Sequence, residues 1–181
     1  MANANKGYMV AESTNLTNAR IFSLQATKDI QNGAIVGKGD LVTGEDQVYV
    51  ALDAYTDGMY LVLNPAWSYH DAHMVNQNEE NYVNKAGVAF RAYRLEKDMK
   101  FKISNIEETF EVGDVVKYDA ATGKYAKDAA GTGSLKVVRV EEQGFPFCIG
   151  SYGVQVAGDT DNEYGYTIGA KTVKYTIEVI K

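Results

Sequence analysis

The sequence predicts an all-β protein: a small antiparallel β-barrel or sandwich with an extended N-terminal arm and one long loop insertion. Short apolar runs recur along the chain, and several of them alternate apolar with polar residues. Turn dipeptides separate the runs, among them Asn32-Gly33, Asp57-Gly58 and Thr122-Gly123. The chain also has 17 Gly and 13 Tyr but 2 Pro, a composition typical of β-domains with many turns.

Composition and charge exclude several classes of protein. The 181 residues are 45% hydrophobic, which is enough for a folded core. With 18 basic and 24 acidic residues, the chain carries a net charge of −6, which argues against binding nucleic-acid phosphates as its main task. No apolar run approaches the roughly 20 residues of a membrane-spanning helix. The first six residues lack the apolar stretch of a signal peptide, so we expect synthesis and folding in the cytoplasm of the cell that makes it.

Residues 1–18 are predicted to form an extended arm. They are polar, rich in Asn and Thr, and show neither a strand period nor a helix period. Their apolar groups are isolated: Tyr8, Met9, Val10 and Leu16. We interpret the segment as an arm that orders against a partner, and a frayed terminus is the alternative.

Residues 19–181 are predicted to form the β-domain. At 87–95, Val88, Phe90 and Ala92 fall on one face, and Gly37 to Asp40 is interpreted as a turn. The last predicted strand places Val173, Tyr175, Ile177 and Val179 on one face. We expect strands at 21–24, 34–36, 47–52, 59–63, 87–95, 101–104, 135–142 and 171–180.

The segment 64–86 differs from the strands around it. Pro65 ends the preceding strand because proline cannot donate to a β-ladder. The segment contains five asparagines, Asn64, Asn76, Asn78, Asn81 and Asn84. It could form a short helix near 76–84 or a long ordered loop. Trp67 and Tyr69 are the kind of side chain that anchors interfaces, so we expect the segment to project and form a contact surface.

No residue pattern identifies an enzyme or a metal site. His70 and His73 are the two histidines of the chain, and a zinc site needs further ligands that nothing nearby supplies. Ser68 and His70 could act as nucleophile and base, but no third residue that would orient the base can be identified. Cys148 lies in an apolar setting that favours an inert thiol, and as the one cysteine it excludes an intrachain disulfide. The acidic stretch 158–163 lacks the Gly and Glu spacing of an EF-hand. We therefore expect no catalytic residue, no metal and no cofactor.

Three stretches carry a resemblance to a known family. They are 110–119 with the following Gly123-Lys124-Tyr125, then 135–142, and finally 173–179. The first resembles the barrel hairpin, and the other two resemble the closing strands, of the capsid decoration (cement) or auxiliary head proteins of tailed bacteriophages. The likeness covers the C-terminal part of the chain, with a weaker echo at 30–52.

The resemblance implies a non-enzymatic late structural protein of the virion, which binds the outside of the capsid and stabilises the lattice. Its partners would be the major capsid protein and other copies on the capsid, with no nucleic acid and no membrane. The arm and the insertion supply the candidate contact residues: Tyr8, Met9, Val10, Leu16, Trp67 and Tyr69.

Three alternatives remain open at the level of sequence. One is another virion β-protein, such as a head fibre or a tail component. A second is a carbohydrate-binding β-sandwich adhesion module, because Tyr rings stack on sugars, although a signal peptide is lacking. The third is a metal-dependent enzyme centred on His70 and His73.

Overall fold

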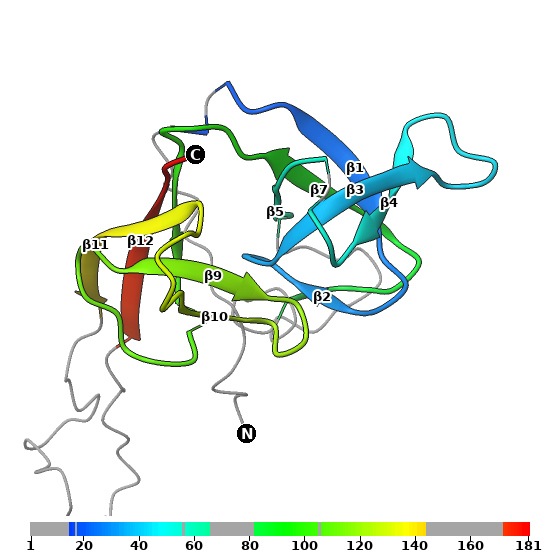
Figure 1. The fold of residues 1–181 in the computed structure, drawn as a ribbon. Coiled ribbons are helices and arrows are strands. Elements are labelled where there is room, and N and C mark those ends of the chain that lie inside the picture. The colour runs from blue at the N-terminus through cyan, green and yellow to red at the C-terminus, as the bar shows by residue number, and fades with distance from the viewer. Residues whose placement is uncertain (1–14, 17, 56, 66–81, 105, 144–171) are drawn as a thin grey trace, which may run out of the picture.

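The computed structural model describes residues 15–16, 18–55, 57–65, 82–104, 106–143 and 172–181 (Figure 1). These residues form twelve strands and no helix, which confirms the all-β prediction, and no helix in these ranges could cross a membrane. The strands are β1 Ile21–Gln25, β2 Ile30–Gln31, β3 Ile35–Leu41, β4 Val48–Leu52, β5 Tyr60–Val62, β6 Val83–Asn84, β7 Ala89–Arg94, β8 Lys100–Ile103, β9 Val115–Asp119, β10 Lys124–Lys127, β11 Leu135–Gln143 and β12 Thr172–Val179.

Five strands close into a barrel in the order β1-β4-β3-β5-β7, and β7 returns to pair with β1. All pairs but one are antiparallel. The exception is β1 with β4, which run parallel and therefore differ from the predicted antiparallel arrangement. β2 and β3 lie between β1 and β4 in the chain, so the two strands are not joined by a hairpin. A longer connection of this kind allows neighbouring strands to run in the same direction.

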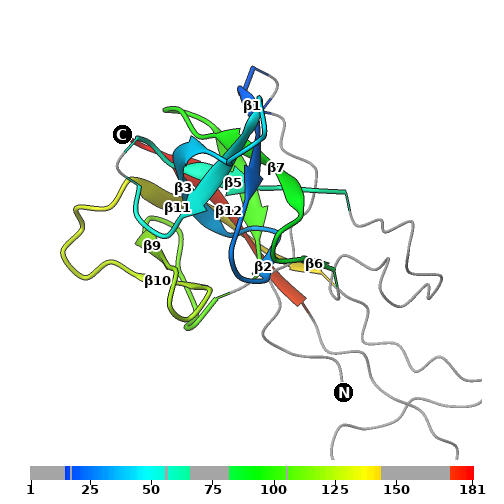
Figure 2. The ribbon, with the colours of Figure 1, turned by 90° about the vertical axis from the view of Figure 1, so that its right-hand side faces the viewer.

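The other large element is a five-stranded antiparallel sheet, β10-β9-β11-β12-β8. Its longest pairing joins β11 to β12, with a register shift between Val137 and Arg139. Figure 1 shows this sheet lying beside the barrel. The short β2–β6 pair forms a third sheet, at the lower end of the barrel in the view of Figure 2.

Two apolar clusters make up the core, and strands β3 and β5 contribute to both. Val36, Tyr60 and Val62 belong to the cluster built from barrel strands. Ile35 and Leu61, the alternate positions, belong to the cluster shared with the five-stranded sheet. Because successive side chains point to opposite faces, both faces of these strands are covered. The barrel and the sheet are therefore held together by a common apolar interior.

The predicted alternation is confirmed where strands pair over their whole length. In β12, Tyr175, Ile177 and Val179 are buried, and in β7 the same holds for Phe90 and Ala92. The assignment of Val88 to that buried face was wrong, since its side chain is 57% exposed. Val88 precedes β7, in a turn that its own amide closes onto the Lys85 carbonyl, and so it lies outside the ladder.

The predicted turn at Gly37 to Asp40 was also wrong, because these residues lie inside β3. The glycine at 37 serves packing instead. A Cβ atom there would collide with the carbonyl oxygen of Ala54. Gly37 therefore permits a close approach of two backbone segments, which is a different use of glycine from a turn.

Leu16 corrects the predicted extent of the arm. Its side chain is 7% exposed and belongs to the core cluster between barrel and sheet. The amide of Ala19 donates to the Leu16 carbonyl at 2.9 Å, and this turn directs the chain into β1. An isolated leucine without a periodic neighbourhood can thus still be buried, when a turn rather than a strand places it. Leu16 is consequently not available as a contact for a capsid.

Candidate functional site

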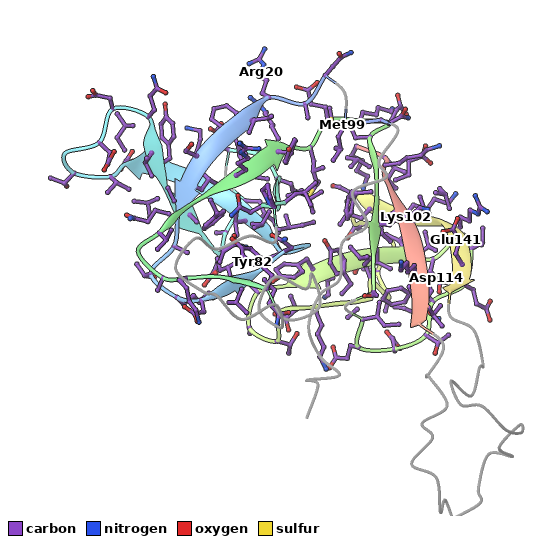
Figure 3. The ribbon with its side chains drawn as sticks, turned by 180° about the vertical axis from the view of Figure 1, so that it is seen from behind. Arg20, Tyr82, Met99, Lys102, Asp114 and Glu141 are labelled. Carbon is purple, nitrogen blue, oxygen red and sulfur yellow. The ribbon has the colours of Figure 1, made fainter. Side chains whose placement is uncertain are left out.

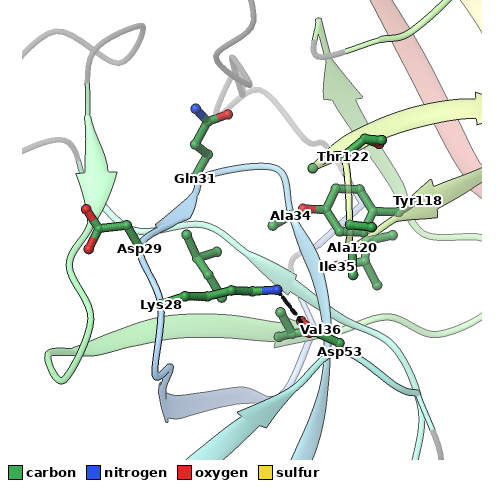
Figure 4. Close-up of a pocket in the computed structure, with 13 residues that line it drawn as sticks. Lys28, Asp29, Gln31, Ala34, Ile35, Val36, Asp53, Tyr118, Ala120 and Thr122 are labelled. Carbon is green, nitrogen blue, oxygen red and sulfur yellow. Dashed lines mark hydrogen bonds and ion pairs between the residues drawn. The ribbon is translucent and has the colours of Figure 1, made fainter.

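One cleft of the described structure lies between the barrel and the β9–β10 hairpin, with a volume of about 370 Å³ (Figure 4). One wall comes from the chain around β2 and β3, and the other from the end of β9 and the turn that follows it. The lining residues are Lys28, Asp29, Ile30, Gln31, Ala34, Ile35, Val36, Asp53, Tyr118, Ala120, Ala121, Thr122 and Gly123.

Charged groups lie on the barrel side of the cleft. Lys28 Nζ contacts the carboxylate of Asp53 at 2.9 Å, with both side chains more than half exposed (Figure 4). Such an exposed pair contributes little to stability. Asp29 accepts a hydrogen bond from the Ala86 amide at 2.9 Å and pairs with Lys85. The hydrogen bond from Ala86, and then Lys85, lower the pKa of Asp29, so this carboxylate is ionised at neutral pH.

Two tyrosines connect the hairpin to the barrel. Tyr55 donates a hydrogen bond from its hydroxyl to the carbonyl oxygen of Tyr118 at 3.0 Å. Burial is the main cause that raises the pKa of both phenols, strongly so for Tyr118. The ring of Tyr118 also packs edge-on against Tyr125, with ring centroids 5.2 Å apart. Both hydroxyls are therefore neutral at physiological pH and act as hydrogen-bonding groups rather than bases.

The hairpin turn forms a preorganised wall. The Asp119 carboxylate accepts hydrogen bonds from the Ala121 amide at 2.9 Å and the Thr122 hydroxyl at 3.1 Å. These bonds, with that from Ala121 the largest, lower the pKa of Asp119. Gly123 has a φ of 70°, which glycine adopts without strain. The turn therefore has its own hydrogen bonds and does not need a ligand to order it.

The chemistry available in the cleft is that of binding. It offers an ammonium, carboxylates and half-buried phenolic surface, which suit a polar ligand or a polar segment of another protein. Its one aliphatic hydroxyl, that of Thr122, donates a hydrogen bond to the Asp119 carboxylate. Within the described ranges, no group of three or more His, Cys, Asp or Glu side chains is placed to hold a metal ion.

A second arrangement anchors both ends of the 64–86 segment. The side-chain nitrogen of Asn32 donates a hydrogen bond to the backbone carbonyl of Asn64 at 2.7 Å. In return, the backbone amide of Asn64 donates to the side-chain oxygen of Asn32 at 3.0 Å. Asn84 donates to the same Asn32 oxygen at 3.1 Å. Tyr82 receives a hydrogen bond from the Asn64 side chain at 2.8 Å. Residues at both ends of the segment 64–86 are thus hydrogen-bonded to the side chain of Asn32, in the turn before β3.

The structure places few of the sequence-predicted contact residues. Tyr8, Met9, Val10, Trp67 and Tyr69 lie outside the described residues, as do Ser68, His70, His73, Cys148 and the stretch 158–163. Leu16 is in the core. The helix considered near 76–84 is contradicted at its end, where β6 pairs with β2 in an antiparallel ladder.

Sequence reasoning missed the cleft. Lys28 and Asp53 are 25 positions apart and carry no motif, so no local pattern joins them. The one local signal was the Thr122-Gly123 turn, which was recognised as a turn and not as a wall of a cleft.

Comparison with known proteins returns no match: no protein-family model, no curated protein and no solved structure is similar to this chain.

Proposed function

We propose that this chain is a non-enzymatic structural protein of a tailed-bacteriophage virion, which binds the outside of the capsid and stabilises its lattice. One observation supports the proposal. The stretches that resemble decoration proteins form the β9–β10 hairpin and the adjacent strands β11 and β12, all within one sheet. Residues far apart in sequence thus form one contiguous sheet. This sheet is the open one beside the closed barrel, whereas the resemblance implies a barrel hairpin and its closing strands.

The rigidity of the domain suits this role. A protein that braces neighbouring capsid subunits must transmit force without deforming, and a shared core with interlocking hydrogen bonds resists shear. The barrel and the sheet share an apolar interior, and the Tyr125 hydroxyl bonds to the Gly33 carbonyl at 2.7 Å across them. On this proposal the protein resides on the capsid surface, with the major capsid protein and other copies of the chain as partners.

Residues 2–14 and the segment 64–86 remain the proposed contacts. Tyr8, Met9 and Val10 would extend onto a capsid subunit by strand addition or by filling shallow pockets. Trp67 and Tyr69 would belong to a segment whose two ends are held in place, because Asn64 is hydrogen-bonded to Asn32 and to Tyr82. Fixed ends lower the entropic cost of ordering a contact segment when it binds.

Binding to heads tests the proposal. Purified chain is added to heads that lack it, from the virus that encodes it, and the bound fraction is measured by co-sedimentation. Wild-type chain should bind in a saturable manner and raise the temperature at which the heads rupture. Deleting residues 2–14 should sharply reduce occupancy and leave the unfolding temperature nearly unchanged, since Leu16 is retained. Failure of the wild-type chain to bind heads would exclude the proposal.

The same preparation separates the proposed role from other virion roles. Gold-labelled antibody against the chain should decorate heads in electron micrographs. Label confined to the tail would identify a tail component, and label on projections from the head would identify a head fibre.

A carbohydrate-binding module is the second candidate, and the cleft between barrel and hairpin favours it. Lys28 and Asp53 offer hydrogen-bonding groups near the Tyr118 ring, a combination that suits sugar hydroxyls and sugar faces. A glycan array tests it directly. Binding that is lost on Asp53→Ala and Tyr118→Ala would favour this function over attachment to a capsid.

A further inference from the structure

The outward face of the five-stranded sheet carries an unusual concentration of positive charge. The pairing register fixes which side chains share it. Phe101, Ile103, Tyr175 and Ile177 point to the core, so the alternate positions of β8 and β12 point outward. The same alternation applies to β9 and β10, and to β11 on each side of the register shift between Val137 and Arg139. We call this surface the basic face, and its basic members are Lys100, Lys102, Lys117, Lys124, Lys136 and Arg139. Lys174 lies on the same side of the sheet but is buried, so it is not counted.

The charge of the basic face is opposite to that of the whole chain. It holds six of the 18 basic residues of the sequence, whereas its acidic members are three of 24. Those three are Asp119, Glu141 and Glu178. A chain with a net charge of −6 thus presents one face with an excess of three positive charges.

The acidic residues on this face are already engaged with their neighbours. Glu141 contacts Lys102 and Arg139, each at 2.9 Å, and Figure 3 shows Lys102 and Glu141 on neighbouring parts of the sheet. Lys102 lowers the pKa of Glu141, which is therefore ionised at neutral pH. Glu178 pairs with Lys100 at 3.2 Å. These carboxylates therefore compensate part of the positive charge of the face, and Lys117 in the same way contributes to the lowered pKa of Asp119.

Two of the remaining cations, Lys117 and Lys136, are exposed to solvent. The Arg139 side chain is also 71% exposed, although it contacts Glu141. Lys136 forms no ion pair with any other described residue. At Lys117 and Lys136 a partner would therefore meet positive charges without first breaking an ion pair to another described residue.

We propose that the basic face docks onto an acidic surface of another protein. Its chemistry argues against nucleic acid as the occupant. No aromatic side chain occupies a described outward position of the sheet, so bases have nothing to stack on. Carboxylates such as Glu141 and Glu178 lie among the cations and would repel a uniform row of phosphates. A folded protein can instead match this mixed pattern charge by charge.

The net negative charge of the chain makes the face directional. Acidic partners are repelled by most of the molecule and attracted by one sheet, so encounters are steered toward a single orientation. Identifying that partner with the capsid rests on the proposed function, whereas the docking face itself does not.

Charge reversal on exposed positions tests the proposal. The variant Lys117→Glu with Lys136→Glu inverts two members of the basic face. The matched control, Arg91→Glu with Lys97→Glu, makes the same change of net charge at exposed positions of β7 and the following turn. A milder pair, Lys117→Gln with Lys136→Gln, serves if the reversed variant unfolds, which circular dichroism would reveal.

The probes are poly-L-glutamate and a short duplex DNA, measured by biolayer interferometry at about 20 mM and about 500 mM salt. Wild-type chain should bind poly-L-glutamate at low salt, more tightly than DNA, and lose it at high salt. The reversed variant should bind at least about tenfold more weakly, the glutamine variant at an intermediate level, and the control like wild type.

Three results would overturn the proposal: no binding of poly-L-glutamate by wild type, equal weakening in the control, or tighter binding to DNA. Sedimentation velocity supplies a fourth outcome. If the wild type forms oligomers that the reversed variant does not, the occupant is a second copy and not a foreign acidic surface. These measurements contain no capsid. The docking face can therefore be disproved while the chain still binds heads, and the chain can fail to bind heads while the docking face is supported.

Discussion

The hydroxyl of Tyr125, on β10, donates a hydrogen bond to the carbonyl oxygen of Gly33 at 2.7 Å, although 92 positions separate the two residues. Gly33 lies in the turn before β3, and Tyr125 is fully buried in the core. The bond therefore ties the five-stranded sheet to the barrel in a place that water does not reach. Burial is the largest cause that raises the pKa of this phenol well above its ordinary value.

Replacing Tyr125 with Phe should lower the free energy of unfolding by about 1 to 3 kcal/mol, since a buried carbonyl loses its donor. Urea denaturation followed by circular dichroism measures the change. Tyr175→Phe is the control, because Tyr175 is equally buried but its hydroxyl makes no hydrogen bond with a described residue. Equal losses in the two variants would mean that the bond to Gly33 adds no stability.

Leu16→Ala should destabilise the domain by about 2 to 5 kcal/mol, the usual range for buried leucines. The reason is its burial between barrel and sheet. Thermal unfolding measures the effect, with the exposed Val112→Ala as a control expected to be nearly neutral. An unchanged melting temperature for Leu16→Ala would show that Leu16 belongs to a free arm after all.

Gly37→Ala should cost about 1 to 3 kcal/mol, because the added methyl group would collide with the Ala54 carbonyl and force the backbones apart. Gly39→Ala, in the same strand, is the matched comparison. Its added methyl group would lie 3.2 Å from both the Leu52 side chain, which can move aside, and the Val50 carbonyl oxygen, a much looser approach to backbone than that at Gly37. Chemical denaturation should therefore rank Gly37→Ala as the more damaging change, and the opposite ranking would contradict the close approach.

Acid should weaken the fold partly through Asp128. Its carboxylate accepts hydrogen bonds from the amides of Gly133 at 2.8 Å and Thr132 at 2.9 Å. The bond from Gly133 is the largest cause that lowers the pKa of Asp128. A lowered pKa stabilises the fold above the ordinary value of 3.8, and this contribution is lost as pH falls through the folded-state pKa.

Asp128→Asn should therefore flatten the dependence of unfolding free energy on pH between about pH 5 and about pH 2. Urea titrations at several pH values measure it. The control is Asp40→Asn, an exposed carboxylate that makes no hydrogen bond with a described residue. If Asp128→Asn leaves the acid limb as steep as in wild type, the turn does not depend on the charge.

The sequence by itself determined the local elements of this protein. Alternation of apolar and polar residues predicted β12 and most of β7, and the dipeptides Asn32-Gly33 and Thr122-Gly123 predicted turns that the structure contains. These features depend on neighbours in the chain, since side-chain alternation and positive φ angles are set within a few residues. The all-β class was predicted because such strand patterns and turn dipeptides recur along the chain.

Only the tertiary structure decided how these elements meet. The parallel pairing of β1 with β4, the burial of Leu16, the use of Gly37 in a strand and the cleft at Tyr118 all depend on segments distant in sequence. The basic face arises in the same way. Its lysines and Arg139 form no motif in the sequence, and they come together because the five strands of the sheet pair side by side. Strand pairing joins residues by register across the sheet, and a single sequence carries no local signal of which register is chosen.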